Sequence, residues 1–445
     1  MKTALENPGL RIFKERFSER LPGEEKETSW LYARRRAAHE RFKSLGFPTR
    51  KHESWKYMDL APILSAAFAV PDSLKAQVLH EKDIRPFLIS ETEATRIVFV
   101  NGVYSSGLSL KAGLPEGVRV ESLSESLGRK EEFLKPHFSF SLENEQNPFA
   151  LINTANFKDG VLLYLPKDTL LVSPIHILFL TLEEKDAQVY QPRVLVVAEE
   201  GVRFKMVENH VSLGKQKNFV NGVTEVCLEE GAKLGFTQIQ RGGLTDFHFS
   251  TNRFRLKKDA RLDFIDFSEG SAVRRNDNAV YFDGEHSFAS LKGLSVLNGN
   301  SQIFDHVSVY HNAPNCVSNQ VYKNILADSA RSEFNSLVSV KKGASGSNSN
   351  QMNRNLLLSD LAQSFSRPQL RIDTDDVSCV HGATVGQLQK DELFYLRSRG
   401  FSKALAKFVL TYGFAEEILT DIQDMRLRKA LETLVEEKLK AVIGG

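Results

Sequence analysis

Cysteine is scarce in this chain of 445 residues, which holds only Cys227, Cys316 and Cys379. The three lie far apart, their number is odd, and no C-x-x-C pair occurs. This spacing argues against a disulfide framework and is typical of a protein from a reducing compartment. It also argues against a structural zinc site built from four local ligands.

Long apolar runs are absent as well. No stretch of about 18 or more apolar residues occurs, so we expect no transmembrane helix and no membrane partner. Residues 1–25 lack the apolar core of a secretory signal, and their acidic residues disfavour an organelle transit peptide. We therefore expect a cytoplasmic protein.

Neither charge is in clear excess. The 58 Lys and Arg residues stand against 56 Asp and Glu residues, which leaves a net charge of +2. Nucleic-acid-binding domains normally carry clustered basic residues and a pI above about 9, so we expect no nucleic-acid partner. The run Arg34-Arg35-Arg36 is short and fits the solvated face of a helix.

The common enzyme signatures are missing. The sequence contains no P-loop, no G-x-G-x-x-G, no G-x-S-x-G and no H-E-x-x-H, and without a P-loop we expect no nucleotide site. Acid pairs such as Asp283 with Glu285 and Asp373 with Asp375 occur, but 56 acidic residues produce such pairs by chance. Because paired carboxylates serve glycoside hydrolysis, a carbohydrate-active enzyme remains an alternative function.

Three regions with different patterns follow one another along the chain. Residues 1–90 are predicted to be helical, since residues 28–45 show helical apolar spacing and Gly46 fits the position after a helix end. Residues 91–386 consist of short runs rich in Val, Ile, Leu and Phe between Gly, Asp and Asn turns, which predicts strands almost throughout. Residues 387–445 are predicted to be helical again.

A degenerate repeat runs through the strand-rich region. Units of a turn followed by a strand begin at Gly231, Asp259, His286, Asn300 and Ser329, at steps of 28, 27, 14 and 29 residues. A unit of about 14 residues that is often doubled favours a stacked β-solenoid. The strands of a sandwich would recur at the shorter spacing of about 8–12 residues. A sandwich or jelly roll is the alternative.

One segment of this region is almost entirely polar. Residues 343–355 read GASGSNSNQMNRN, a composition that resembles a flexible linker. In a solenoid the same residues would form a turn and a stacked column of Asn and Ser. We expect a partly mobile loop.

The C-terminal region carries an amphipathic pattern. Ser402 is a suitable N-cap for the helix that follows it. Further on, a helical apolar stripe consists of Leu427, Leu431, Leu434, Val435, Leu439 and Val442. We expect these helices to pack on the end of the solenoid, to dock a partner, or to do both.

Cys379 and His381 are the most informative pair of potential ligands. They lie two residues apart in DDVSCVHGAT, so on a strand their side chains share a face. A thiolate and an imidazole form half a site for iron or for a sulfur-handling centre, and a second chain would supply the rest. The alternative is a partly buried cysteine beside a hydrogen-bonded histidine.

The other cysteines allow weaker interpretations. His306, His311 and Cys316 have suitable chemistry for a soft metal, but spacings of five residues and a turn containing proline give no reason for them to converge. We interpret them as structural turn residues. Cys227, in TEVCLEEG, is interpreted as a small core hydrophobe.

Residues 375–400, DDVSCVHGATVGQLQKDELFYLRSRG, closely resemble the signature of the SufB/SufD family of iron–sulfur cluster assembly proteins. Further similar segments are NPFALINTANFKDGVLLYLPKD (147–168), HNAPNCVSNQVYKNILADSARSEFNSLVSV (311–340), LLLSDLAQSFSRPQLRI (356–372) and FAEEIL (414–419). HESWKYMDL, from His52, is similar to a segment of SufD-type members. A SufB-type member is the alternative within the family.

The resemblance implies a right-handed parallel β-helix core flanked by helical N- and C-terminal regions. It implies a scaffold subunit without catalysis of its own, in a complex with a SufB-type subunit and a SufC-type ABC ATPase that hydrolyses the nucleotide. The C-terminal helices resemble the ATPase-docking region. In isolation the chain would be able to form a homodimer.

The resemblance also assigns a role to the Cys-x-His pair. Cys379 and His381 match the family's Cys-x-His, and His381 stands at the position implicated in holding a transient iron–sulfur cluster or iron at the SufB–SufD interface. Val380 departs from the small polar residue often found between them. A flavin would serve the whole complex, and no flavin site is recognisable in this chain.

Overall fold

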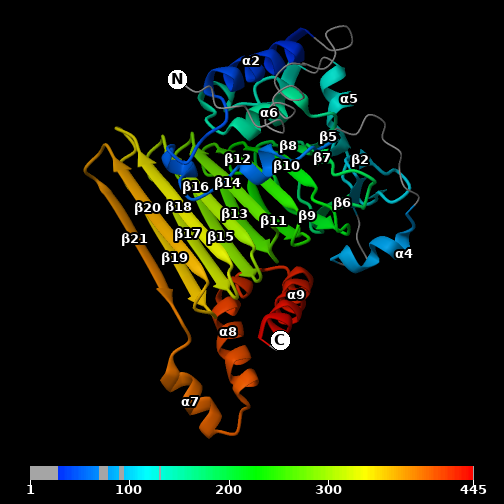
Figure 1. Ribbon diagram of the computed structural model, residues 1–445. Coiled ribbons are helices and arrows are strands. Elements are labelled where there is room, and N and C mark those ends of the chain that lie inside the picture. Colours follow the sequence, from blue (N-terminus) through cyan, green and yellow to red (C-terminus); the bar gives the residue numbers. More distant parts are fainter. Residues whose placement is uncertain (1–28, 70–78, 90–94, 130–131, 444–445) are drawn as a thin grey trace, which may run out of the picture.

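The computed structural model describes residues 29–69, 79–89, 95–129 and 132–443 (Figure 1). Residues 1–28, which include the segment considered above for targeting signals, lie outside the described residues. The helical elements up to residue 156 are α2 (Ser29–Leu45), η1 (Glu53–Trp55), α3 (Ala61–Leu64), α4 (Glu81–Ile84), η2 (Arg85–Phe87), α5 (Leu123–Gly128), η3 (Glu132–Leu134), η4 (Leu142–Asn144) and α6 (Pro148–Asn156). The C-terminal helices are α7 (Lys390–Ser398), α8 (Lys403–Leu419) and α9 (Met425–Ile443).

The strands form two long sheets. Sheet 1 follows the order β2-β1-β6-β9-β11-β13-β15-β17-β19-β21, with β3 beside β1. Its strands are β1 (Thr95–Val100), β2 (Val103–Tyr104), β3 (Leu110–Lys111), β6 (Ile175–Thr181), β9 (Arg203–Ser212), β11 (Lys233–Arg241), β13 (Arg261–Ser268), β15 (Phe288–Leu297), β17 (Val317–Leu326), β19 (Ser347–Leu357) and β21 (Val377–Gly386).

Sheet 2 has the order β20-β18-β16-β14-β12-β10-β8-β5-β4, with β7 beside β10. Its strands are β4 (Arg119–Ser122), β5 (Gly160–Leu165), β7 (Val189–Tyr190), β8 (Arg193–Ala198), β10 (Phe219–Leu228), β12 (Phe247–Leu256), β14 (Val273–Phe282), β16 (Gln302–His311), β18 (Arg331–Val340) and β20 (Gln363–Ile372). From β9 onward the chain alternates between the sheets and every pairing is parallel. The solenoid expectation is confirmed.

The repeat seen in the sequence corresponds to the corners of the solenoid. At one corner a residue in the left-handed backbone conformation recurs on every turn: Gly201, Gly231, Asp259, His286, Asn315 and Gly346. The amide of each donates to a carbonyl at the same corner of the next turn, for example Gly231 N to Lys258 O at 2.9 Å. Because Gly, Asp, Asn and His tolerate this conformation best, the corner residues vary while the turn length stays between 27 and 31 residues.

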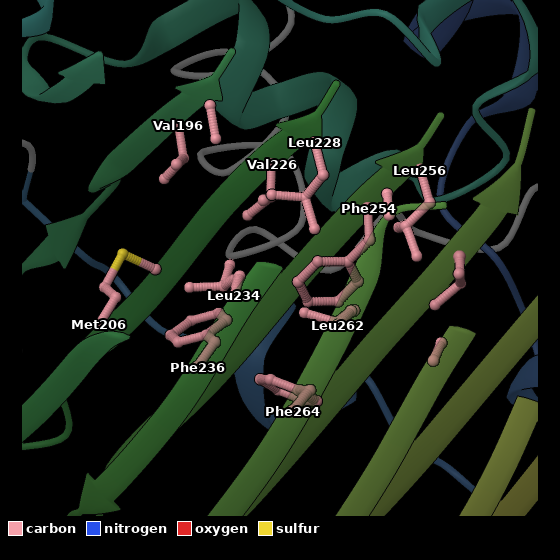
Figure 2. Packing of buried hydrophobic residues seen from close by; sticks show 14 of the residues in the cluster. Val196, Met206, Val226, Leu228, Leu234, Phe236, Phe254, Leu256, Leu262 and Phe264 are labelled. Atoms are coloured by element: carbon pink, nitrogen blue, oxygen red, sulfur yellow. The ribbon is translucent and has the colours of Figure 1, made fainter. Parts of the chain in front are cut away.

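Between the two sheets lies one apolar core. Figure 2 shows Val226, Phe254 and Leu256 of sheet 2 facing Leu234, Phe236 and Phe264 of sheet 1, and all six are almost fully buried. Inward-facing residues alternate along each strand, as the period of two requires. This core forms most of the solenoid interior.

The interior also contains a buried charged cluster. The Arg274 guanidinium pairs with the Asp266 carboxylate, and the Asn276 amide donates to Asp266 Oδ2 at 2.8 Å and to Asp305 Oδ1 at 2.7 Å. Burial, followed by the neighbouring Asp266 charge, raises the pKa of Asp305 to about 7. Asp305 is therefore a carboxyl group that titrates near neutral pH inside the solenoid.

The N-terminal helices cover the outer face of sheet 2. Phe42, Trp55 and Phe149 pack there against Phe219 and Phe249. Leu123–Gly128 and Pro148–Asn156, which were expected to continue the strands, instead form helices α5 and α6 in this layer (Figure 1). The side chain of Asn147 caps α6 and Pro148 occupies its first turn, a helix start that outweighs the strand-like composition.

The C-terminal helices cover the outer face of sheet 1. The predicted stripe of α9 is confirmed, since Leu427, Leu431, Val435 and Leu439 are buried, and Ser402 caps α8 by accepting from the Leu405 amide. The helices do not close the solenoid's end, however. They pack on its side, because outward-facing apolar residues of sheet 1 such as Phe267 and Val296 provide a matching surface.

The expectation of a mobile loop at 343–355 is wrong. Residues Ser347–Leu357 form strand β19, paired with β17 on one side and β21 on the other. Alternate polar side chains of β19 point inward and bond along the stack, as Asn355 does when its Oδ1 accepts from Asn324 Nδ2 at 2.8 Å. None of the helices in the described residues is long and apolar enough to cross a membrane.

Candidate functional site

The last turn of the solenoid has two open edges. Within the described residues, β21 pairs only with β19, and β20 pairs only with β18. Both strands are ten residues long; β21 is largely exposed, β20 is mostly half-buried, and neither contains a fully buried residue. An edge strand presents unpaired N–H and C=O groups, so this end of the molecule is a template for additional strands.

Cys379 and His381 lie on β21, at this open end. The strand places Cys379 in register with Ser349 and His381 in register with Gln351. Cys379 is half-buried and packs against the core, whereas His381 is exposed. Burial raises the pKa of the Cys379 thiol, and the Ser349 backbone amide partly offsets this effect.

The interior becomes polar toward these two residues. The column that ends at His381 runs Phe236, Phe264, Leu291, Gln320, Gln351, and the column that ends at Cys379 runs Leu234, Leu262, Ala289, Ser318, Ser349. Hydrogen bonds link the polar members: Ser318 donates to Ser349 at 2.8 Å, and Gln351 donates to Ser336 at 2.7 Å. The Cys-x-His pair thus terminates a polar interior rather than an apolar one.

Apolar side chains surround this open end. Leu361, Ile372, Val380 and Val385 are exposed on or beside the last two strands. We call these four residues the end patch. Open edges combined with exposed apolar side chains are typical of a surface that a protein partner covers.

The pair can supply only part of a metal site. A thiolate and an imidazole suit iron and other soft metals, but four ligands are usual for clusters. In the described part of the chain, no group of three or more His, Cys, Asp and Glu side chains is arranged to hold a metal ion. Any cluster carried here as cargo would need ligands from a second chain.

The looser candidates do not converge. His306 points outward toward Glu333, at 3.8 Å between Nε2 and Oε2, whereas His311 points inward to the Ser318 hydroxyl at 3.0 Å. Cys316 is buried at a corner, and its thiol donates to Gly284 O at 3.3 Å. Cys227 is fully buried, and burial raises its pKa to about 12. Cys227 is a buried core residue, as expected, and Cys316 lies at a corner, but His306 and His311 belong to strand β16 rather than to a turn.

Sequence reasoning named no residues on α7 and α8 that a partner would contact. Figure 1 shows α7 and the first part of α8 extending away from the solenoid. Exposed on them are Phe394, Tyr395, Phe401, Leu405 and Val409, which we call the α7 patch. The signal was present in the sequence as two aromatic residues, Phe394 and Tyr395, inside a charged helix.

Comparison with known proteins gives two matching family models. The SufBD core domain of the SUF system for iron–sulfur cluster assembly matches residues 180–414, and the SufBD N-terminal region matches residues 15–177. Together they span the solenoid, the N-terminal layer and the start of the C-terminal helices.

Relatives of full length agree with these matches. A SufBD family iron–sulfur cluster assembly protein from Synechocystis is 31% identical, over 92% of this chain and 91% of its own. The cluster assembly protein SufD of Escherichia coli is 27% identical, over 88% and 90%, and SufD of Bacillus subtilis is 24% identical, over 93% and 95%. The chain belongs to the SufBD family of iron–sulfur cluster assembly proteins.

Proposed function

We propose that this chain is a SufD-type scaffold subunit that pairs with a SufB-type subunit through β20 and β21. The observation that carries the proposal is the open last turn, where two unpaired strand edges and the end patch surround Cys379 and His381. A partner with its own open solenoid end would extend both sheets across the interface. His381, with Cys379 beside it, would then face ligands from the partner.

The cluster, or the iron that enters it, is the cargo of this interface. His381 is exposed and available to it, whereas Cys379 is half-buried and needs the interface to open before it can bind. One imidazole and one thiolate from this chain would complete a site together with groups of the second subunit.

A SufC-type ATPase would dock on the α7 patch. The exposed aromatic residues Phe394 and Tyr395 are of the kind that anchor protein interfaces. Because this chain has no P-loop, the partner would hydrolyse the nucleotide. The resulting movement of α7 and α8 would shift the pairing at the last turn and make Cys379 accessible beside His381.

Two features support a SufD-type subunit over a SufB-type one. The relatives from Escherichia coli and Bacillus subtilis are named SufD, and HESWKYMDL at residues 52–60 resembles SufD-type segments. If the chain were SufB-type, it would pair with a SufD-type partner instead. Offering both partners to the tagged chain and identifying the bound subunit decides between them.

Co-expression tests the proposal as a whole. With SufB-type and SufC-type subunits, the chain should elute as one stable complex under reducing conditions. Elution of this chain alone, while the other two subunits fold and remain available, would reject the proposal.

A further inference from the structure

A groove on the side of the solenoid, away from the last turn, has no role in the proposed assembly. It has a volume of about 500 Å³ and lies on the outer face of β9, β11 and β13. The segment 170–174 forms one wall, and the connection between α8 and α9 at residues 421–424 forms the other. Its size is within the range of small-molecule sites.

A column of positive charge runs along the groove. Arg203, Lys233 and Arg261 occupy the same register position on three neighbouring strands. Such positions are about 4.8 Å apart, and like charges directly opposite one another are destabilising. Their repetition in one column therefore calls for negative charge nearby.

Only part of that charge is balanced by the protein. Asp263 holds Arg261 through hydrogen bonds of 2.7 and 3.0 Å. Among the described residues, the side chains of Arg203 and Lys233 have no ion pair or hydrogen bond. Both are exposed at the rim of the groove.

The remaining charges in the groove cancel. Lys205 Nζ lies 3.6 Å from Asp424 Oδ2, and Lys292 pairs with Asp421. The lining thus comprises five cations and three carboxylates, and Arg203 and Lys233 are the excess.

Most of the remaining lining is apolar, apart from Thr237, Ser290 and Gln423. Leu170 and Val172 are exposed on one wall, at 63% and 80%, and Ile265 lies on the floor. Gly235 leaves the centre of the floor without a side chain. A ligand here would meet paired positive charge at one end and an apolar surface beside it.

We propose that this groove binds an organic phosphate, a molecule with a phosphate group and an apolar or planar body of about mononucleotide size. Arg203 would bind the phosphate with its planar guanidinium and Lys233 would add a second charge. The body would lie over Gly235 against Leu170 and Val172. The absence of a P-loop predicts binding without hydrolysis.

Calorimetry on the full chain tests this proposal with AMP, adenosine and inorganic pyrophosphate as probes. AMP should bind with a Kd below about 1 mM. Adenosine, which lacks the phosphate, should bind at least about tenfold more weakly. AMP binding should weaken from about 0.1 M to about 1 M salt, because the excess charges are exposed.

Variants separate the two halves of the site. Arg203→Gln with Lys233→Gln should weaken AMP binding about tenfold or more. Lys341→Gln with Lys342→Gln removes two exposed cations at the same corner, four turns further along the stack from Lys233, and should leave AMP binding unchanged. Gly235→Leu should weaken AMP but not pyrophosphate, and the strand accepts it because an added Cβ meets only Lys205 Cγ, at 3.6 Å.

Three results would overturn the proposal. The first is no AMP binding by correctly folded protein, with the fold checked by circular dichroism. The second is equal loss of AMP binding in the two double variants. The third is sedimentation with phosphatidic acid vesicles without any AMP binding, which would assign the positive charge to a membrane headgroup.

Discussion

Cys379 and His381 share one strand but differ in how readily they can bind a ligand. The thiol packs against the core and burial raises its pKa above the ordinary value of 9.0, so it stays protonated near neutral pH. The imidazole is exposed. We therefore expect His381 to bind iron or the cluster in the resting interface, and Cys379 to bind only after the interface opens.

Replacement of His381 by Ala should leave the complex intact and lower its cluster content. Loss of even an outer-shell group costs about 10–100-fold in metal affinity, so loss of a ligand should lower reconstituted cluster by about tenfold. Iron and sulfide content and the visible absorption spectrum of the purified complex measure it. Thr384→Ala, also exposed on β21, is the matched control; normal cluster yield in His381→Ala would exclude this residue.

Asp305 predicts a pH dependence of stability. Its pKa rises from 3.8 to about 7 on folding, so the folded state holds a proton that the unfolded state loses, and the contribution of Asp305 to stability falls as pH rises from 4 to 7. Asp305→Asn should remove this contribution, so the variant should gain stability relative to the unchanged protein as pH rises toward 8, by on the order of a few kcal/mol. Urea unfolding from pH 4 to 8 measures it, and parallel curves for the two proteins would contradict it.

At the residue level the sequence indicated candidate ligand residues but not where all of their side chains point. The spacing of Cys379 and His381 correctly placed both on one strand. For His306 and His311 the spacing could not show which one points to the outer face of the sheet and which one to the core, because strand phase depends on which face packs.

At the level of the elements, the edge strands β20 and β21 should determine whether the chain binds the SufB-type subunit. Val380 is 57% exposed at the centre of β21. Val380→Asp would place a carboxylate in the interface, and the Kd for the SufB-type subunit should rise about tenfold or more. Val172→Asp is the matched control, since this valine is also exposed but lies beside β6, far along the sheet. Surface plasmon resonance with the tagged partner should separate the two variants, and equal affinities would place the interface elsewhere.

The α7 patch should decide docking of the ATPase. Phe394 is 73% exposed, and Phe394→Ser should raise the Kd for the SufC-type subunit about 10-fold or more, as for a central interface aromatic. Leu244→Ser removes an exposed apolar residue at a solenoid corner and should have no effect. Pull-down with titrated ATPase measures both, and unchanged docking of Phe394→Ser would argue for a different surface.

Helices and strands could be predicted correctly from the sequence where the local sequence pattern and the tertiary packing favour the same element. The α9 stripe and the Ser402 cap were both predictable, since each depends on neighbours in the chain. Strand β19 was not, because its Ser and Asn residues become strand-like only when the polar columns of adjacent turns bond to them. The position of α8 and α9 on the side of sheet 1 likewise depends on outward apolar residues from five different strands.

At the scale of the whole molecule, three layers leave one end uncovered. The N-terminal helices cover sheet 2, α8 and α9 cover sheet 1, and the last turn is open (Figure 1). Without its partner, the chain should dimerise through this end, because the open edges can pair with those of a second copy. Analytical ultracentrifugation should show a dimer that Val380→Asp dissociates and that the SufB-type subunit replaces. A monomer at all concentrations would contradict this prediction.

The packing of α8 and α9 has a mechanical consequence. Their apolar residues contact five successive strands of sheet 1, from Val207 on β9 to Ile325 on β17, a span of about 19 Å along the solenoid axis. A force applied at α7 therefore acts on all five turns together. These turns must rotate as one rigid unit. The distance that β21 moves then depends on how far the open end lies from the helices. Inserting one further turn between them would therefore change the movement of β21 without changing any residue at either surface.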